Sequence, residues 1–114
     1  MGQNALHLAS ERGHTETVKI LIDKFVENKI DLNEKDKDGS NPLHIASKEG
    51  HKEIVDLLIN KRIDLNAKDN NGRIPLDLAQ LNGRKEIVNL LINKYIENGN
   101  DINYLDHKKS CIIS

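Results

Sequence analysis

The feature that most constrains this chain is an internal repeat with a period of about 33 residues. Residues 36–68 read DKDGSNPLHIASKEGHKEIVDLLINKRIDLNAK, and imperfect copies stand on both sides of this stretch. Three short segments with Leu second and Ala fifth lie at 5–9, 42–46 and 75–79. Three longer apolar segments lie at 13–22, 50–59 and 83–92. Such periodicity indicates stacked units, because a single unit can bury its apolar face only against its neighbours.

The overall composition argues against several classes of function. Seventeen basic and eighteen acidic residues give a net charge of −1, which offers no broad basic face for nucleic acid. One Phe and two Tyr are the only aromatic residues, so base-stacking platforms are not expected. The single cysteine fits a cytoplasmic, intracellular protein without an internal disulfide. No apolar run approaches the roughly 18 residues that a membrane span needs.

The histidines do not have the spacing of metal ligands. His7 and His44 occupy one repeated position, His14 and His51 another, and no Cys or second His lies within ligand spacing of either pair. We expect them to bond backbone groups at helix starts and turns. Since the sequence also has no phosphate-binding loop and no nucleophile–base constellation, we expect a non-catalytic protein without a metal, cofactor or small-molecule substrate.

The central unit predicts two helices and a hairpin loop. Asn41 is a good N-cap, and Pro42 suits the first position of a helix that runs to about Glu49. Gly50 then ends this helix. A second helix is predicted from about Lys52 to Lys61, because its apolar residues recur at helical spacing: Ile54, Val55, Leu58 and Ile59. Residues 69–72 are rich in turn formers and predict a hairpin loop.

These residues identify a resemblance to ankyrin-repeat proteins. The family pattern D-x-x-G-x-T-P-L-H-x-A-x-x-x-G-H-x-E-I-V-x-L-L-L matches residues 36–59 along its length. The resemblance implies an all-α repeat solenoid, in which helix-turn-helix units stack with hairpin loops on one side. It further implies a single domain over 1–114, with repeats at about 2–35, 36–68 and 69–105 and a partial fourth repeat or tail at 106–114.

The outer repeats depart from the central one. Their second helical segments carry four additional residues, about one helical turn, and the apolar pattern continues through Phe25 and Tyr95. We therefore predict longer helices in which these aromatic residues extend the core; the alternative is a larger loop. Repeat three is degenerate at polar positions, with Ile74 at the capping position and Arg84 where His51 stands.

The first short helix is as apolar as the internal one, although terminal repeats usually present a polar outer face. We therefore expect an uncovered face there, either because the chain belongs to a longer array or because another molecule covers it. Self-association through this face is a hypothesis that sedimentation can test.

The resemblance implies that a protein partner binds the hairpin tips and the exposed side of the short helices. The first hairpin contributes Lys35, Lys37, Asp38 and Ser40. The second contributes Lys68, Asn70, Asn71 and Arg73. The short helices contribute Glu11, Arg12, Lys48, Glu49, Leu81 and Asn82. Leu81 is the one apolar residue in its slot, so it either anchors a partner or folds onto its neighbour.

Two modification motifs accompany these positions. Residues 111–114 read CIIS and fit a C-terminal prenylation box at Cys111, with Lys108 and Lys109 upstream. One lipid and two lysines give only reversible membrane association. Alternatively, residues 106–113 align with the start of a fourth repeat. Asn66 resembles the hairpin asparagines that are hydroxylated in some ankyrin proteins, although a turn role explains it as well.

Three roles follow from these observations. The first is a non-catalytic protein–protein interaction module, a scaffold or adaptor that uses its hairpins and short helices. The second is a lipid-anchored, membrane-targeted adaptor. The third is a structural spacer within a longer ankyrin array.

Overall fold

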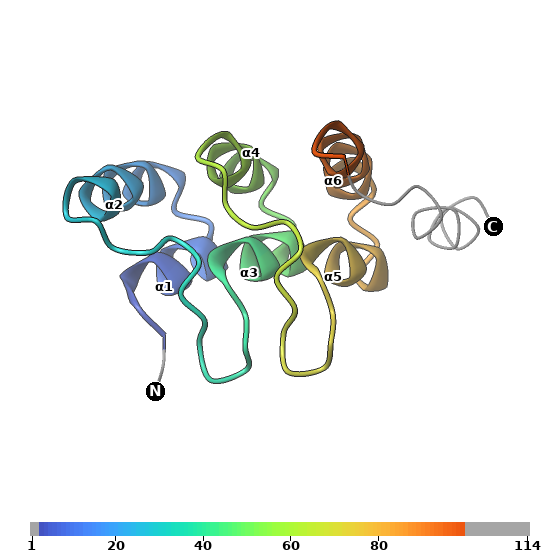
Figure 1. The fold of residues 1–114 in the computed structure, drawn as a ribbon, viewed down its shortest axis with the longest axis horizontal. Coiled ribbons are helices and arrows are strands. Elements are labelled where there is room, and N and C mark those ends of the chain that lie inside the picture. Colours follow the sequence, from blue (N-terminus) through green and yellow to red (C-terminus); the bar gives the residue numbers. More distant parts are fainter. Residues whose placement is uncertain (1–2, 100–114) are drawn as a thin grey trace.

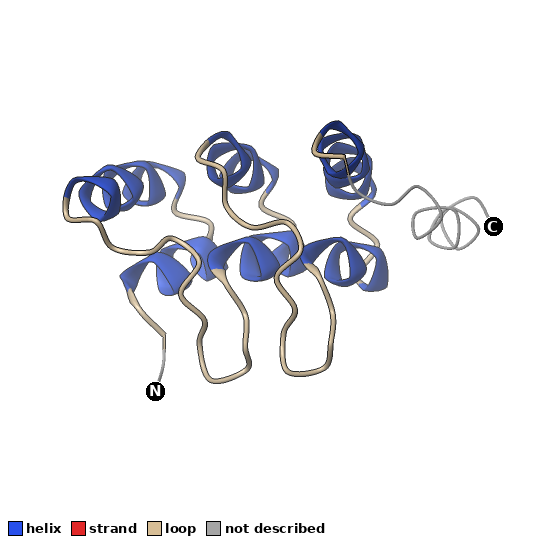
Figure 2. Cartoon of the chain, viewed as in Figure 1, coloured by secondary structure: helices blue, strands red, loops and turns tan. Residues whose placement is uncertain are grey.

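A computed structural model describes residues 3–99 as six α-helices joined by loops (Figure 1). The helices are α1 (Ala5–Arg12), α2 (Thr15–Glu27), α3 (Pro42–Glu49), α4 (Lys52–Asn60), α5 (Pro75–Leu81) and α6 (Lys85–Glu97). Figure 2 shows helices and loops, and no strand, over these residues. The described part is therefore all-α, as the repeat pattern predicts.

The helices form two layers. The short helices α1, α3 and α5 lie side by side in one layer, and the second helices α2, α4 and α6 lie in the other (Figure 1). Each short helix packs against the helix that follows it, and each pair packs against the next pair. Two long loops, between α2 and α3 and between α4 and α5, project from the same side of the stack (Figure 1). This arrangement is the predicted solenoid.

The short helices begin and end where their capping residues predict. At the start of α3, the Asn41 side chain accepts a hydrogen bond from the backbone N–H of His44 at 2.9 Å. At its end, Gly50 adopts the left-handed conformation, with φ of 84°. In α5, Ile74 has no polar side chain, and instead the carboxylate of Asp77 accepts from the N–H of Ile74 at 3.0 Å. In the central repeat, the side chains of Asn41 and His44 each accept a hydrogen bond from the other residue's backbone N–H. The third repeat keeps only the bond from the cap backbone N–H to the side chain three residues later.

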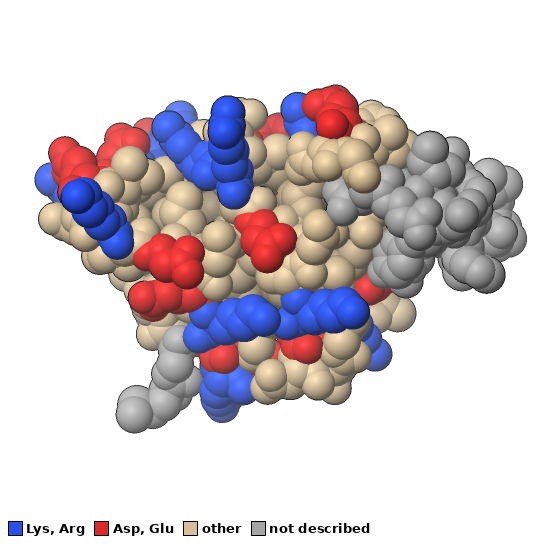
Figure 3. All heavy atoms as spheres, in the orientation of Figure 1, with Lys and Arg blue, Asp and Glu red and all other residues tan. Residues whose placement is uncertain are grey.

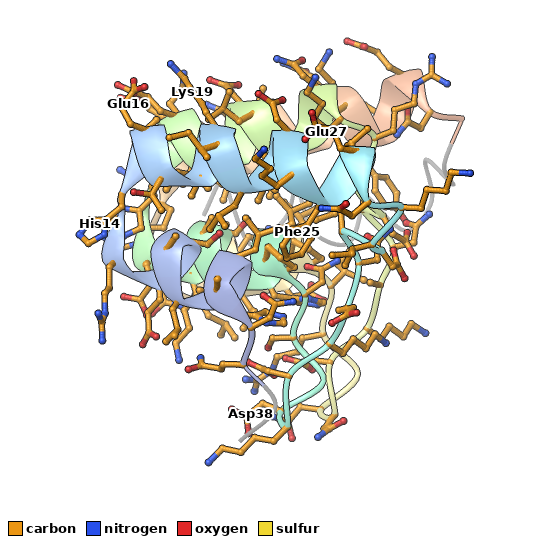
Figure 4. The ribbon with its side chains drawn as sticks, turned by 90° about the vertical axis from the view of Figure 1, so that its left-hand side faces the viewer. His14, Glu16, Lys19, Phe25, Glu27 and Asp38 are labelled. Carbon is orange, nitrogen blue, oxygen red and sulfur yellow. The ribbon has the colours of Figure 1, made fainter. Side chains whose placement is uncertain are left out.

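The longer second helices of the outer repeats are confirmed. Helices α2 and α6 each span 13 residues, whereas α4 spans 9. Phe25, in the added turn of α2, is only 8% exposed and lies between the two helix layers in Figure 4. Tyr95 in α6 packs against the same core and is partly buried. The added residues therefore continue the helices and do not form a larger loop.

The first repeat presents one face without a neighbouring repeat. Leu8 is 37% exposed, whereas Ile45 and Leu78 at the same repeat position are 9% and 8% exposed. Ile20 in α2 is 61% exposed. Thr17 is exposed where the two later repeats have buried isoleucines. This end face is therefore mixed, with two exposed aliphatic residues beside polar ones.

Candidate functional site

The first hairpin (residues 35–40) is closed by its own acidic residue. One carboxylate oxygen of Asp36 accepts from the backbone N–H groups of Asp38 at 2.9 Å and Ser40 at 3.0 Å. The backbone N–H of Asp36 donates to the carbonyl of Ser40 at 2.9 Å. This Asx-type arrangement fixes the turn and directs the Asp36 side chain into the loop.

The second hairpin (residues 68–73) repeats this arrangement. One Asp69 carboxylate oxygen accepts from the N–H groups of Asn71 and Arg73, each at 2.9 Å. The two loops are also bonded to each other. The backbone N–H of Asn70 donates to the carbonyl of Asp38 at 3.0 Å, and its side-chain amide donates to the carbonyl of Lys37 at 2.8 Å. The hairpins therefore form one connected unit.

Two histidines join the hairpins to the short helices. The Nε2 atom of His7 lies 2.8 Å from the carbonyl oxygen of Glu34, and that of His44 lies 2.9 Å from the carbonyl oxygen of Arg73. The Nδ1 atom of His44 accepts from the N–H of Asn41 at 3.0 Å. This set of partners favours the neutral tautomer of His44 that carries its proton on Nε2. The expectation that histidines bond backbone groups is confirmed at both positions.

Burial of the imidazole lowers the pKa of His44 below its ordinary value of 6.5. The carbonyl of Arg73 opposes this effect, because it accepts a hydrogen bond from the ring and favours the protonated form. Since burial has the larger effect, the neutral form of His44 is stabilised in the folded protein.

A second set of links joins the ends of the short helices to the next repeat. The Nε2 atom of His51 lies 3.0 Å from the carbonyl oxygen of Glu11. Arg84 stands at the same position of the following repeat, and its Nε–H donates to the carbonyl of Lys48 at 3.1 Å. The sequence analysis did not predict this role, and it interpreted Arg84 as a departure from the histidine of the repeat pattern. The alignment with His51 was the signal, since both side chains can donate a hydrogen bond.

The predicted partner-binding residues lie on the hairpins and at the ends of the short helices. Twelve of them are exposed: Glu11, Arg12, Lys35, Lys37, Asp38, Lys48, Lys68, Asn70, Asn71, Arg73, Leu81 and Asn82. Ser40 and Glu49 are partly buried. The hairpins turn away from the helix axes, and Asp38 lies near a hairpin tip (Figure 4).

Some of these residues also have a structural bond. The side-chain amide of Asn82 donates to the carbonyl of Leu78 at 2.8 Å and caps the end of α5. The side-chain amide of Asn70 joins the two hairpins. The ammonium of Lys35 donates to the carbonyl of Lys68 at 2.9 Å. Leu81 is 63% exposed, and its role as an apolar anchor stays a prediction.

Ion pairs among the described residues lie on the second helices and not on the hairpins. They join Lys19 to Glu16, Lys24 to Glu27, Lys52 to Asp56 and Lys94 to Glu97. Figure 4 shows Glu16 and Lys19 on the outer side of α2. Figure 3 shows a row of Lys and Arg side chains across the hairpin side of the molecule, with some acidic side chains beside it.

A pocket of about 550 Å³ lies beside the shortened end of α4. Its lining includes Ile59 and Arg62 from the end of α4 and the following loop, and Lys94 and Glu97 from the end of α6. It lies where α4 ends a turn earlier than α6. Sequence reasoning did not predict it, although the four-residue difference between the repeats was its signal.

Within residues 3–99, no three His, Cys, Asp or Glu side chains are grouped so that they could hold a metal ion. Over the same residues, no helix is long and apolar enough to cross a membrane. Asn66 is exposed, and its backbone N–H donates to the Asp64 carboxylate at 2.8 Å. Cys111 and His107 lie outside the described residues.

Stacked helix pairs with projecting hairpins define an α-helical repeat protein. The family model for ankyrin repeats in three copies matches residues 1–69 and 23–106, so this chain belongs to the ankyrin-repeat family. Ankyrin repeats are generally protein–protein interaction modules, and the family is typically non-catalytic. A comparison with curated protein sequences gave no match.

Proposed function

We propose that this chain is a non-catalytic scaffold that binds a protein partner through its two hairpins and the exposed ends of its short helices. The observation that carries this proposal is the connection of both hairpins to each other and to the helices beneath them. Asn70 bonds two carbonyls of the first hairpin, and His44 bonds the second. A loop surface that is ordered before binding loses less conformational entropy when a partner binds it.

The exposed side chains support the same proposal. Lys37 and Arg73 lie on the hairpins, and Leu81 lies at the end of α5 with 63% of its surface exposed. Arg is enriched among interface hot spots, and an exposed aliphatic residue such as Leu81 can add apolar contact area. Because these side chains are not needed for stacking, they can differ between ankyrin proteins without a change of fold.

Affinity capture with a matched pair of variants tests this proposal. Partners recovered by the wild-type chain would be identified by mass spectrometry and compared with those of a Lys37→Ala, Arg73→Ala, Leu81→Ala variant. We expect recovery to fall by at least about tenfold, equivalent to about 1.4 kcal/mol. The control replaces three exposed residues of the second-helix layer with alanine: Ile20 in α2, Lys61 directly after α4 and Lys85 at the start of α6.

The control variant should recover the partner as the wild type does, and circular dichroism should show both variants folded. Equal recovery by the wild type and the hairpin variant, with loss in the control variant, would place the binding surface on the second helices.

A further inference from the structure

We propose that the hairpin surface binds an acidic segment of its protein partner. This inference rests on the proposed protein-binding function and adds the chemistry of the segment that is bound. It follows from the way the hairpins use their carboxylates.

The acidic residues of the hairpins are largely occupied by the loops themselves. Asp36 and Asp69 each accept two backbone hydrogen bonds within their own loop, and both are partly buried. Asp38 is the remaining hairpin carboxylate, and it is exposed. Two of the three hairpin carboxylates are therefore directed to backbone N–H groups and not to an approaching partner.

The basic residues of the hairpins face solvent. Four of them are exposed: Lys35, Lys37, Lys68 and Arg73. The ion pairs found within residues 3–99 involve other residues, all on α2, α4 and α6. The ammonium of Lys35 bonds the carbonyl of Lys68, which leaves its charge without a carboxylate partner. Four exposed cations thus accompany one exposed carboxylate on this surface.

A carboxylate-bearing segment is the complementary ligand. It would pair with cations that the protein itself leaves unpaired, and such pairs increase association rate and specificity. A nucleic acid is also acidic, but this chain has no aromatic residue on the hairpins. Bases would find no stacking partner there, so the observations favour a protein segment.

Binding of synthetic probes tests the inference. Fluorescence anisotropy would measure the affinity of the full chain for three probes. They are a Glu-rich peptide, a Gln-rich peptide of the same length and a single-stranded oligonucleotide. Amide chemical-shift changes would locate the bound probe. We expect the Glu-rich peptide to bind at least about tenfold more tightly than the Gln-rich one, with shifts at 35–41 and 68–74, and this preference should weaken in high salt because salt screens exposed charges.

Charge-reversal variants locate the effect. Lys37→Glu with Arg73→Glu should remove the preference for the Glu-rich peptide. Lys61→Glu with Lys85→Glu, directly after α4 and at the start of α6, should retain it. Absence of binding by the Glu-rich peptide, equal affinity for both peptides, or equal losses in both variants would overturn the inference. Tighter binding of the oligonucleotide would overturn it in favour of nucleic acid.

The outcome is separable from that of the proposed function. If partner capture depends on the hairpins but the Glu-rich probe shows no preference, the acidic character of the partner is wrong and the binding function stands. If partner capture is unaffected by hairpin variants, the proposed function itself fails.

Discussion

At the scale of single residues, the buried histidines show why a polar group is retained within an apolar stack. His44 is fully buried, yet each of its ring nitrogens has a backbone partner: the N–H of Asn41 and the carbonyl of Arg73. A buried backbone group that loses its partner costs about 1–3 kcal/mol. The imidazole therefore provides a hydrogen-bond partner both for the backbone at the start of α3 and for the backbone at the base of the second hairpin.

The buried state of His44 predicts a pH-dependent stability. Its pKa is lowered on folding, so above pH 6.5 the ring is neutral in both states and its contribution is fully present. As the pH falls below 6.5, the unfolded chain binds a proton that the folded protein does not, and the free energy of unfolding decreases by at most about 1.4 kcal/mol per pH unit.

Urea unfolding at pH 7.5 and pH 5.5 measures this contribution when the wild type is compared with His44→Gln. The variant should be less stable at pH 7.5 and should lose less stability on acidification. His14→Gln, which removes an exposed imidazole, should stay within about 0.5 kcal/mol of the wild type at pH 7.5. If the free energy of unfolding fell equally in the wild type and the His44 variant between pH 7.5 and pH 5.5, His44 would not be the source of the pH dependence.

At the scale of elements, the hairpins are similar in sequence but unequal in their surroundings. Gly39 and Gly72 both have positive φ, at 78° and 76°. A Cβ atom at Gly39 would lie 2.5 Å from the side-chain oxygen of Asn70 and 2.7 Å from its backbone nitrogen, whereas one at Gly72 would meet nothing within 4 Å. The first hairpin therefore has the second packed against it.

Alanine substitutions at these two glycines should separate backbone strain from hairpin packing. Gly72→Ala should cost about 1–2 kcal/mol, because positive φ is unfavourable for any residue with a Cβ atom. Gly39→Ala should lower the free energy of unfolding by more. It has the same backbone strain, and in addition its Cβ atom would overlap Asn70 and break the hydrogen bonds between the hairpins. Urea unfolding gives both values, and equal costs would show that contact between the hairpins adds nothing to stability.

The helices could be predicted closely and the exposed surface could not. Apolar periodicity predicted the added turns at Phe25 and Tyr95, because burial restricts these positions to large apolar side chains. The bond from Arg84 to Lys48 was missed, since a surface link between repeats leaves no apolar pattern. Likewise, exposure of the hairpin lysines follows from the fold, but nothing in their spacing shows what they bind.

At the scale of the whole molecule, the two aliphatic side chains on the first repeat are unusual for an end face. Leu8 and Ile20 are 37% and 61% exposed, whereas aliphatic residues at the position of Leu8 in later repeats are below 10%. Terminal repeats of such stacks need a polar outer face for solubility, which Thr17 provides only in part.

We therefore expect this chain, studied alone, to self-associate weakly through its first repeat. Sedimentation equilibrium should show an average mass that rises with concentration, because association removes Leu8 and Ile20 from water. A Leu8→Glu, Ile20→Glu variant should remain monomeric, while Val26→Glu, which changes another exposed aliphatic residue of α2, should behave as the wild type does. A wild-type mass independent of concentration would contradict this prediction.

The bonds between repeats also have a mechanical consequence. His51 and Arg84 each join one repeat to the repeat before it, and each helix pair packs against the next pair. Tension applied along the stack would therefore act on each interface in series, and the repeats should separate one interface at a time. Such a molecule responds to force by stepwise extension, with each step releasing one pair of helices and its hairpin.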